Sequence, residues 1–137
     1  MLAAIQRLSR EYELPVANVF HAGDGNLHPL ILYKADMPDV QTRVRDLGAA
    51  ILRECLAAGG SITGEHGVGS DKRCYLDWMF APDDLATMEL LRSAFDPDRR
   101  ANPGKVFPTP KSCGESARRQ VTLAREGIEM PSDVKAF

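Results

Sequence analysis

The stretch VANVFHAGDGNLHPLILY (residues 16–33) contains two runs of strand-forming residues separated by a turn. Residues 16–22 and residues 27–33 both supply β-branched, aromatic and other apolar side chains. Between them lies Asp24-Gly25, a pair that tolerates the positive φ angles of tight hairpin turns. The stretch therefore predicts an antiparallel β-hairpin, and this hairpin decides the fold class because helical patterns flank it on both sides.

Apolar side chains recur at helical spacing before and after this hairpin. Residues 2–13, residues 37–60 and residues 83–95 each carry an apolar stripe at steps of three and four. Residues 61–70 predict a short strand that enters a tight loop, and residues 95–108, with three prolines, predict an irregular segment. The order of elements predicts an α+β fold in which helices pack on one face of a small antiparallel sheet, a ferredoxin-like half followed by a C-terminal helical segment.

Length and composition fit one compact domain and exclude several classes of protein. The chain has 137 residues, 44% of them hydrophobic, and a net charge of −2, which creates no basic surface for nucleic acid. No apolar stretch approaches the roughly 20 residues of a transmembrane helix, and the N-terminus lacks the apolar core of a signal peptide. We expect a cytoplasmic protein with three free cysteine thiols, one domain over residues 1–108 and a partly mobile tail over residues 109–137.

All three histidines of the chain lie in glycine-rich stretches. His21 and His28 stand on the two arms of the predicted hairpin, nearly opposite each other if the turn is centred on the Asp-Gly pair. Glu65 adds a carboxylate, and two histidines with one carboxylate leave the open coordination position of a catalytic metal site. Spacing alone favours three unconnected histidines over a metal site. Glu65 and His66 are adjacent, so on an extended segment their side chains would diverge.

Three motifs taken together carry a family resemblance. HAGDGNLHP, GGSITGEHGVGSDK and FDPDRRANPGKVFP occur in the order found in the C-terminal region of the FAD-linked oxidase family, which the chain resembles over roughly residues 1–108. Members of that family include the flavin subunit of glycolate oxidase, D-lactate dehydrogenase and D-2-hydroxyglutarate dehydrogenase. The resemblance implies the C-terminal catalytic portion of a larger FAD-dependent 2-hydroxy-acid oxidase or dehydrogenase. It also implies that FAD is bound mainly by a separate N-terminal domain, so we expect this chain alone to be inactive.

The resemblance implies a role for the three histidines and the glutamate of the first two motifs. His21, His28 and Glu65 are implied to bind a divalent metal, and zinc, manganese and iron all suit this set of ligands. Such a metal would hold the hydroxyl and carboxylate oxygens of a 2-hydroxy acid and make the hydroxyl more acidic. His66 is implied to be the base that takes the hydroxyl proton, while hydride passes to FAD.

Two asparagines and two basic residues complete the set of candidates. The resemblance places Asn102, in the NPGK turn, near the flavin and the substrate. Asn26 is a candidate for substrate binding, since its side-chain amide can support the site. Lys72 and Arg73 are candidates for binding the substrate carboxylate, but we expect both to be solvated surface charges.

The expected partners follow from the same reading of the sequence. They are a small 2-hydroxy acid and a flavin-binding domain in the same or another chain, with a homo-oligomer also possible, and they include neither nucleic acid nor a membrane-spanning segment. The sequence does not select among glycolate, D-lactate and D-2-hydroxyglutarate as the substrate. The alternative to an enzyme is a free-standing metal-binding or partner-binding module without flavin activity.

Overall fold

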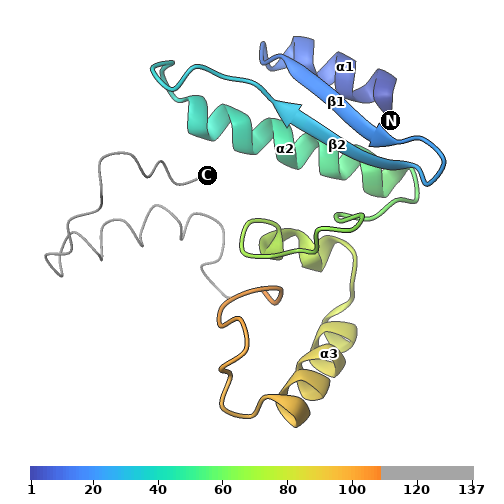
Figure 1. Cartoon of the computed structure of the whole chain (residues 1–137), viewed down its shortest axis with the longest axis vertical. Coiled ribbons are helices and arrows are strands. Elements are labelled where there is room, and N and C mark those ends of the chain that lie inside the picture. Colours follow the sequence, from blue (N-terminus) through green and yellow to red (C-terminus); the bar gives the residue numbers. More distant parts are fainter. Residues whose placement is uncertain (109–137) are drawn as a thin grey trace, which may run out of the picture.

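A computed structural model describes residues 1–108, and it confirms the predicted α+β fold (Figure 1). The tail expected over residues 109–137 lies outside the described residues. No helix within the described part is long and apolar enough to cross a membrane. In chain order the elements are α1 (Leu2–Glu11), β1 (Val16–His21), β2 (Asn26–Ile31), α2 (Val40–Ala57), the 3-10 helix η1 (Arg73–Trp78) and α3 (Pro82–Phe95).

The predicted hairpin is confirmed, but its register is shifted, so that the residue opposite His21 is two positions earlier in β2 than expected. β1 and β2 pair antiparallel, and His21 lies opposite Asn26 while His28 lies opposite Val19. The turn covers residues 22–25, so its centre falls one residue earlier than the Asp-Gly pair. His21 and His28 are therefore diagonal neighbours on one face of the sheet rather than directly opposed residues.

Helices α1 and α2 cover the same face of the hairpin, as the sequence predicts (Figure 1). Leu47 of α2 is fully buried and lies at the centre of this layer. Leu27 and Ile31 of β2 pack against the same core, so the alternate residues of β2 point to the opposite, open face. The core cluster consists of Ile5, Leu8, Leu14, Val40, Leu47 and Ile51.

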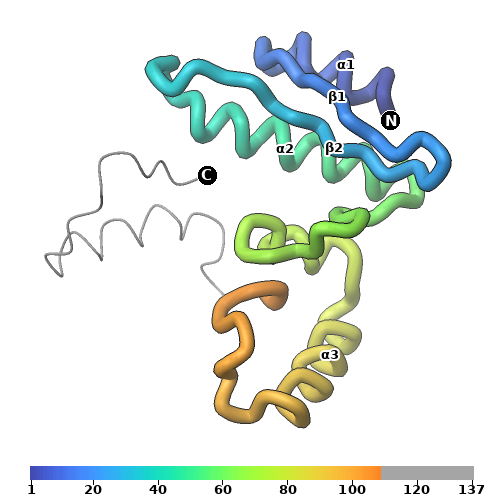
Figure 2. The backbone as a smooth tube through the Cα atoms, viewed as in Figure 1, coloured from blue at the N-terminus to red at the C-terminus, as the bar shows by residue number. Residues whose placement is uncertain are grey.

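The chain leaves α2 through a glycine-rich loop that crosses between the sheet and the C-terminal elements (Figure 2). The strand expected within residues 61–70 is wrong, because this segment contains only turns, bends and irregular backbone. Gly67 and Gly69 take positive φ angles of 81° and 61°, which a strand cannot accommodate. Beyond the loop, η1 leads into α3, and residues 96–108 turn back along it (Figure 1).

Cys55, one of the three cysteines expected to carry free thiols, lies in α2 and has a free thiol, as expected.

Candidate metal and active site

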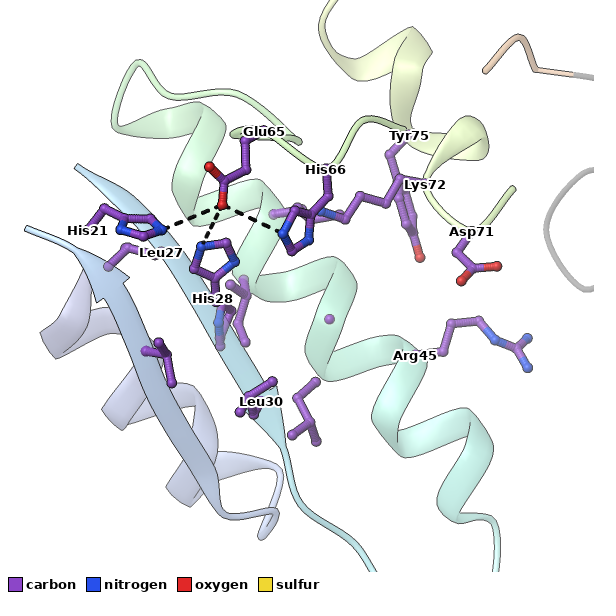
Figure 3. A pocket seen from close by; sticks show the side chains of 16 residues that line it. His21, Leu27, His28, Leu30, Arg45, Glu65, His66, Asp71, Lys72 and Tyr75 are labelled. Atoms are coloured by element: carbon purple, nitrogen blue, oxygen red, sulfur yellow. Dashed lines mark ion pairs between the residues drawn. The ribbon is translucent and has the colours of Figure 1, made fainter. Parts of the chain in front are cut away.

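The hairpin and the glycine-rich loop bring four titratable side chains to one point on the open face of the sheet (Figure 3). One carboxylate oxygen, Oε1 of Glu65, lies at the centre of the group. The Nε2 atoms of His28, His21 and His66 lie 3.3, 3.5 and 3.6 Å from it. The two arms of the hairpin and the glycine-rich loop thus form a single cluster of His21, His28, Glu65 and His66, called the histidine–glutamate cluster below.

The hairpin register explains why its two histidines share a face. Successive side chains of a strand alternate between faces, and paired positions point the same way. His21 is paired with Asn26 and His28 is two residues further along β2, so both imidazoles project away from the helices. Their ring centroids are 5.4 Å apart and the rings are nearly perpendicular, at 84°.

The loop places Glu65 and His66 together rather than apart. The expectation that their side chains diverge is wrong, since His66 Nε2 lies 3.6 Å from Glu65 Oε1. That expectation required an extended backbone, whereas the loop bends here, with Gly67 at a φ of +81°. The ring of His66 also lies 4.9 Å from the ring of His28, measured between centroids.

Gly64 is the point where the loop touches the hairpin. A Cβ atom at this position would collide with the side-chain amide of Asn26, at the start of β2. A glycine is therefore needed for the backbone of the loop to approach the strand this closely. The side chain of Asn26 therefore lies against the loop one residue before Glu65, and its role in substrate binding stays a prediction.

The geometry of His21, His28 and Glu65 fits a divalent metal. Each residue offers one ligand atom, and these atoms all lie within 4.8 Å of one another. In a tetrahedral site with bonds of about 2.0–2.1 Å, neighbouring ligand atoms are about 3.3–3.4 Å apart. The two histidine–glutamate distances, 3.3 and 3.5 Å, match that separation. Three ligands would leave one position open toward solvent.

A cavity of about 740 Å³ opens beside the cluster. The cluster residues form one end of it, and mostly apolar side chains of β2 and α2 form its walls (Figure 3). Four other polar side chains, Arg45, Asp71, Lys72 and Tyr75, also line it. Burial lowers the pKa of the Lys72 ammonium, opposed by the charge of Cys55, and burial raises the pKa of the Tyr75 phenol.

The two asparagines predicted from the sequence lie in different places. Asn26 lines a second cavity, of about 640 Å³, together with Glu65. Asn102 is exposed in a turn with a φ of +46°, and Arg92 donates hydrogen bonds to its carbonyl and to that of Ala101. Asn102 lines neither of these two cavities and is not among the residues that converge on Glu65.

Two basic residues were misjudged from the sequence. Lys72 is half-buried and lines both cavities, and Arg73 is only 7% exposed, so the expectation of two surface charges is wrong. Lys72 donates a hydrogen bond to the carbonyl of Ile62, and Arg73 donates one to the carbonyl of Gly104. The sequence did offer one signal of their structural role, because both residues directly follow a glycine-rich loop that must be held in place by contacts.

Comparison with known proteins identifies the family of the chain. Residues 1–106 match the family described as FAD linked oxidases, C-terminal domain. The chain is 50% identical over 115 residues to glycolate oxidase subunit GlcD of Escherichia coli (strain K12), covering 84% of this chain and 23% of that protein. It is 35% identical over 95 residues to the mitochondrial D-lactate dehydrogenase [cytochrome] of Arabidopsis thaliana, covering 69% and 17%.

A third relative is the D-2-hydroxyglutarate dehydrogenase of Stutzerimonas stutzeri (strain A1501), which is 37% identical over 93 residues and matches 64% of this chain and 19% of that protein. The family match covers most of the chain, so the chain belongs to the FAD linked oxidases, C-terminal domain family. It spans about a quarter or less of the length of the curated relatives that it matches.

Proposed function

We propose that this chain supplies the metal-binding and proton-accepting part of the active site of an FAD-dependent oxidoreductase that acts on a 2-hydroxy acid. The observation that carries the proposal is the convergence of three imidazole Nε2 atoms on one oxygen of Glu65, at 3.3 to 3.6 Å. The named relatives support the substrate class, since glycolate, D-lactate and D-2-hydroxyglutarate are all 2-hydroxy acids.

In this proposal His21, His28 and Glu65 bind the metal and leave its open side toward solvent. A divalent metal held there would supply a Lewis acid for the adjacent hydroxyl and carboxylate oxygens of the substrate. The side chains of His21 and Glu65 are 56% and 52% exposed, whereas that of His28 is 21% exposed. The cluster is therefore open to a small anionic molecule, and His28 is its most buried member.

His66 is the proposed base. Its Nε2 is close to Glu65, yet His66 is not part of the set of ligand atoms that lie within 4.8 Å of one another. Its side chain is 75% exposed, so the imidazole is accessible to a hydroxyl group bound at the metal position. A histidine is suited to this step because its ordinary pKa lies near neutral pH.

FAD would supply the acceptor of the two electrons. The described residues fit only part of a flavin site, because neither GDG nor GVG stands in the strand–turn–helix context of a dinucleotide-binding motif. The proposal assigns Asn102 to contact with the flavin and Asn26 to the support of the substrate site, the latter because its amide touches Gly64. A flavin-binding domain in the same or another chain would provide the rest.

Metal analysis of the purified chain tests the proposed site. We expect about one equivalent of zinc, manganese or iron in the unaltered chain, since the donor set is complete within it. A His21→Ala/His28→Ala variant should lose the metal, because a single carboxylate cannot hold it. Elemental analysis after exposure to each metal and removal of excess ions measures the result.

A His66→Gln variant is the matched control, because it alters a histidine of the cluster that is not a proposed ligand. It should keep its metal. In the longer protein that contains the flavin domain, the same variant should lower kcat by about 10²–10⁴-fold. Equal metal content in the unaltered chain and the double variant would contradict the ligand assignment, and unchanged kcat in the His66 variant would contradict the base assignment.

A further inference from the structure

The segment from Ile62 to Lys72 carries two of the four cluster residues but contains no helix or strand. Glycines at positions 64, 67 and 69 give its backbone additional freedom. A metal site needs its ligands held to within fractions of an ångström, and a free loop does not provide this. Some contact outside regular secondary structure must therefore hold Glu65 next to the hairpin histidines.

Lys72 makes a contact of this kind at the base of the loop. Its ammonium group donates a hydrogen bond of 2.9 Å to the carbonyl of Ile62, ten residues earlier. Ile62 is 1% exposed, and its N–H group lies 3.5 Å from the sulfur of Met79, so this end of the loop is anchored in the protein interior. The bond joins the two ends of the loop that displays Glu65 and His66.

The surroundings of Lys72 differ from those of a solvated surface lysine. The side chain is half-buried, it lines both cavities beside Glu65, and burial lowers the pKa of its ammonium group. A hydrogen bond from a charged donor is roughly twice as strong as one between neutral groups, so the bond from Lys72 is suited to hold the loop. Two further contacts fix the same loop, since Gly64 lies against Asn26 and the N–H of Val106 donates to the carbonyl of Gly69.

We infer that Lys72 is a positioning residue, whose ammonium group closes the loop from Ile62 to Lys72 and so holds Glu65 at the two histidines of the hairpin. This inference rests on the proposed metal site. It assigns Lys72 no contact with substrate. It predicts that the loss of this one hydrogen bond weakens metal binding although every metal ligand is still present.

The experiment compares the affinity of the full chain for Zn²⁺ and Co²⁺ in three variants. Lys72→Met keeps the apolar stem and removes the charge and the donor, and we expect it to raise the Kd for Zn²⁺ about 10- to 100-fold, as loss of a supporting residue around a metal site does. Lys72→Arg keeps a charged donor and should recover part of this loss. Lys34→Met removes an exposed lysine and should leave Kd within about twofold.

Two further readouts separate positioning from a general loss of stability. The absorption spectrum of bound Co²⁺ reports the arrangement of its ligands, and it should change in Lys72→Met but not in Lys34→Met. The thermal midpoint of each metal-free variant is measured by circular dichroism, and affinities are compared well below these midpoints. If Lys72→Met is unfolded even at the temperature of the affinity measurement, the Kd and the Co²⁺ spectrum of Lys72→Arg decide whether Lys72 positions Glu65.

The failure of this inference can be distinguished from the failure of the proposed function. If the unaltered chain binds no metal, the proposed metal site is wrong and the inference falls with it. If the unaltered chain binds metal, and Lys72→Met has the same Kd and the same Co²⁺ spectrum, the metal site stands and the role of Lys72 is overturned. A raised Kd with an altered spectrum and partial recovery in Lys72→Arg supports the inference.

Discussion

Single residues at the contact between loop and hairpin determine the geometry of the cluster. Asn26 fills the space that a side chain on Gly64 would need, and Gly64 immediately precedes the carboxylate at the centre of the cluster. A change of one methyl group at this contact must displace either the amide or the loop. The cluster is therefore sensitive to a position that carries no chemistry of its own.

Gly64→Ala should destabilise the fold by about 1–3 kcal/mol, because the added Cβ collides with the Asn26 amide. It should also weaken metal binding, because the collision moves Glu65 away from His28. Denaturant unfolding and Zn²⁺ titration measure the two effects. Gly48→Ala is the matched control, since a Cβ there meets nothing within 4 Å and a helical alanine stabilises by about 0.5–1 kcal/mol. Equal changes in stability and Zn²⁺ affinity for Gly64→Ala and Gly48→Ala would contradict the predicted collision.

The sequence predicted the members of the cluster better than their geometry. His21, His28, Glu65 and His66 were all identified beforehand, and the structure brings all four together. The predicted orientation of Glu65 relative to His66 was wrong, because this orientation depends on backbone angles in a glycine-rich loop, and no periodic sequence pattern encodes them. Asn102 was proposed by resemblance alone, and it is not among the residues that converge on Glu65.

At the scale of elements, η1 packs against α2 through two aromatic residues. Tyr75 and Trp78 have ring centroids 4.6 Å apart, and the guanidinium of Arg53, from α2, lies 4.7 Å from the centre of the Trp78 ring. Burial in this contact raises the pKa of Tyr75, with smaller opposing effects from Arg45 and Arg53 and a smaller supporting one from Asp46. The contact is thus favoured while the phenol is neutral.

The free energy of unfolding should report this contact through its dependence on pH. The stabilisation from a neutral Tyr75 is fully present below the ordinary tyrosine pKa of 10.0 and is lost as the pH rises through the higher pKa of the folded state. Burial lowers the pKa of Lys72, which changes stability with pH in the opposite direction, so we compare two proteins that both contain this lysine. Relative to Tyr75→Phe, the unaltered chain should lose stability above about pH 10, as measured by urea unfolding at successive pH values. A difference that is independent of pH would contradict the prediction.

Elements with a clear period or a clear stop signal were predictable, and others were not. α2 ends at Ala57, shortly before the Gly59-Gly60 pair, and α1 ends a few residues before Pro15. The strand expected within residues 61–70 does not exist, because small residues there serve turns rather than a pleated surface. The six-residue helix η1 was not foreseen, since one or two turns carry too few residues to establish a period.

At the scale of the whole molecule, the described residues leave the cluster on an open surface. The helices cover only the opposite face of the hairpin, and exposed apolar side chains border the cluster on its own face, among them Val19 at 57% and Leu30 at 51% exposed. The relatives are four or more times longer than the part that this chain matches. In the proposed enzyme, a flavin-binding domain covers this face.

We therefore expect the 137-residue chain, purified alone, to bind metal but to show no flavin absorbance after incubation with FAD and gel filtration. It should also fail to oxidise glycolate or D-lactate, because the described residues form only one wall of the site. A longer protein that includes the flavin domain is the positive control. A yellow chain with 2-hydroxy-acid activity would show that these residues suffice and that the proposed division of labour is wrong.

The placement of both hairpin ligands within one short stretch has a consequence for the denatured chain. His21 and His28 are separated by only six residues, so they remain near each other even when the protein is unfolded. A metal ion can then bind the two imidazoles in the denatured ensemble, which reduces the gain in stability that binding to the native state would produce. Heat-denaturation shifts on adding zinc should accordingly be smaller than the directly measured affinity implies.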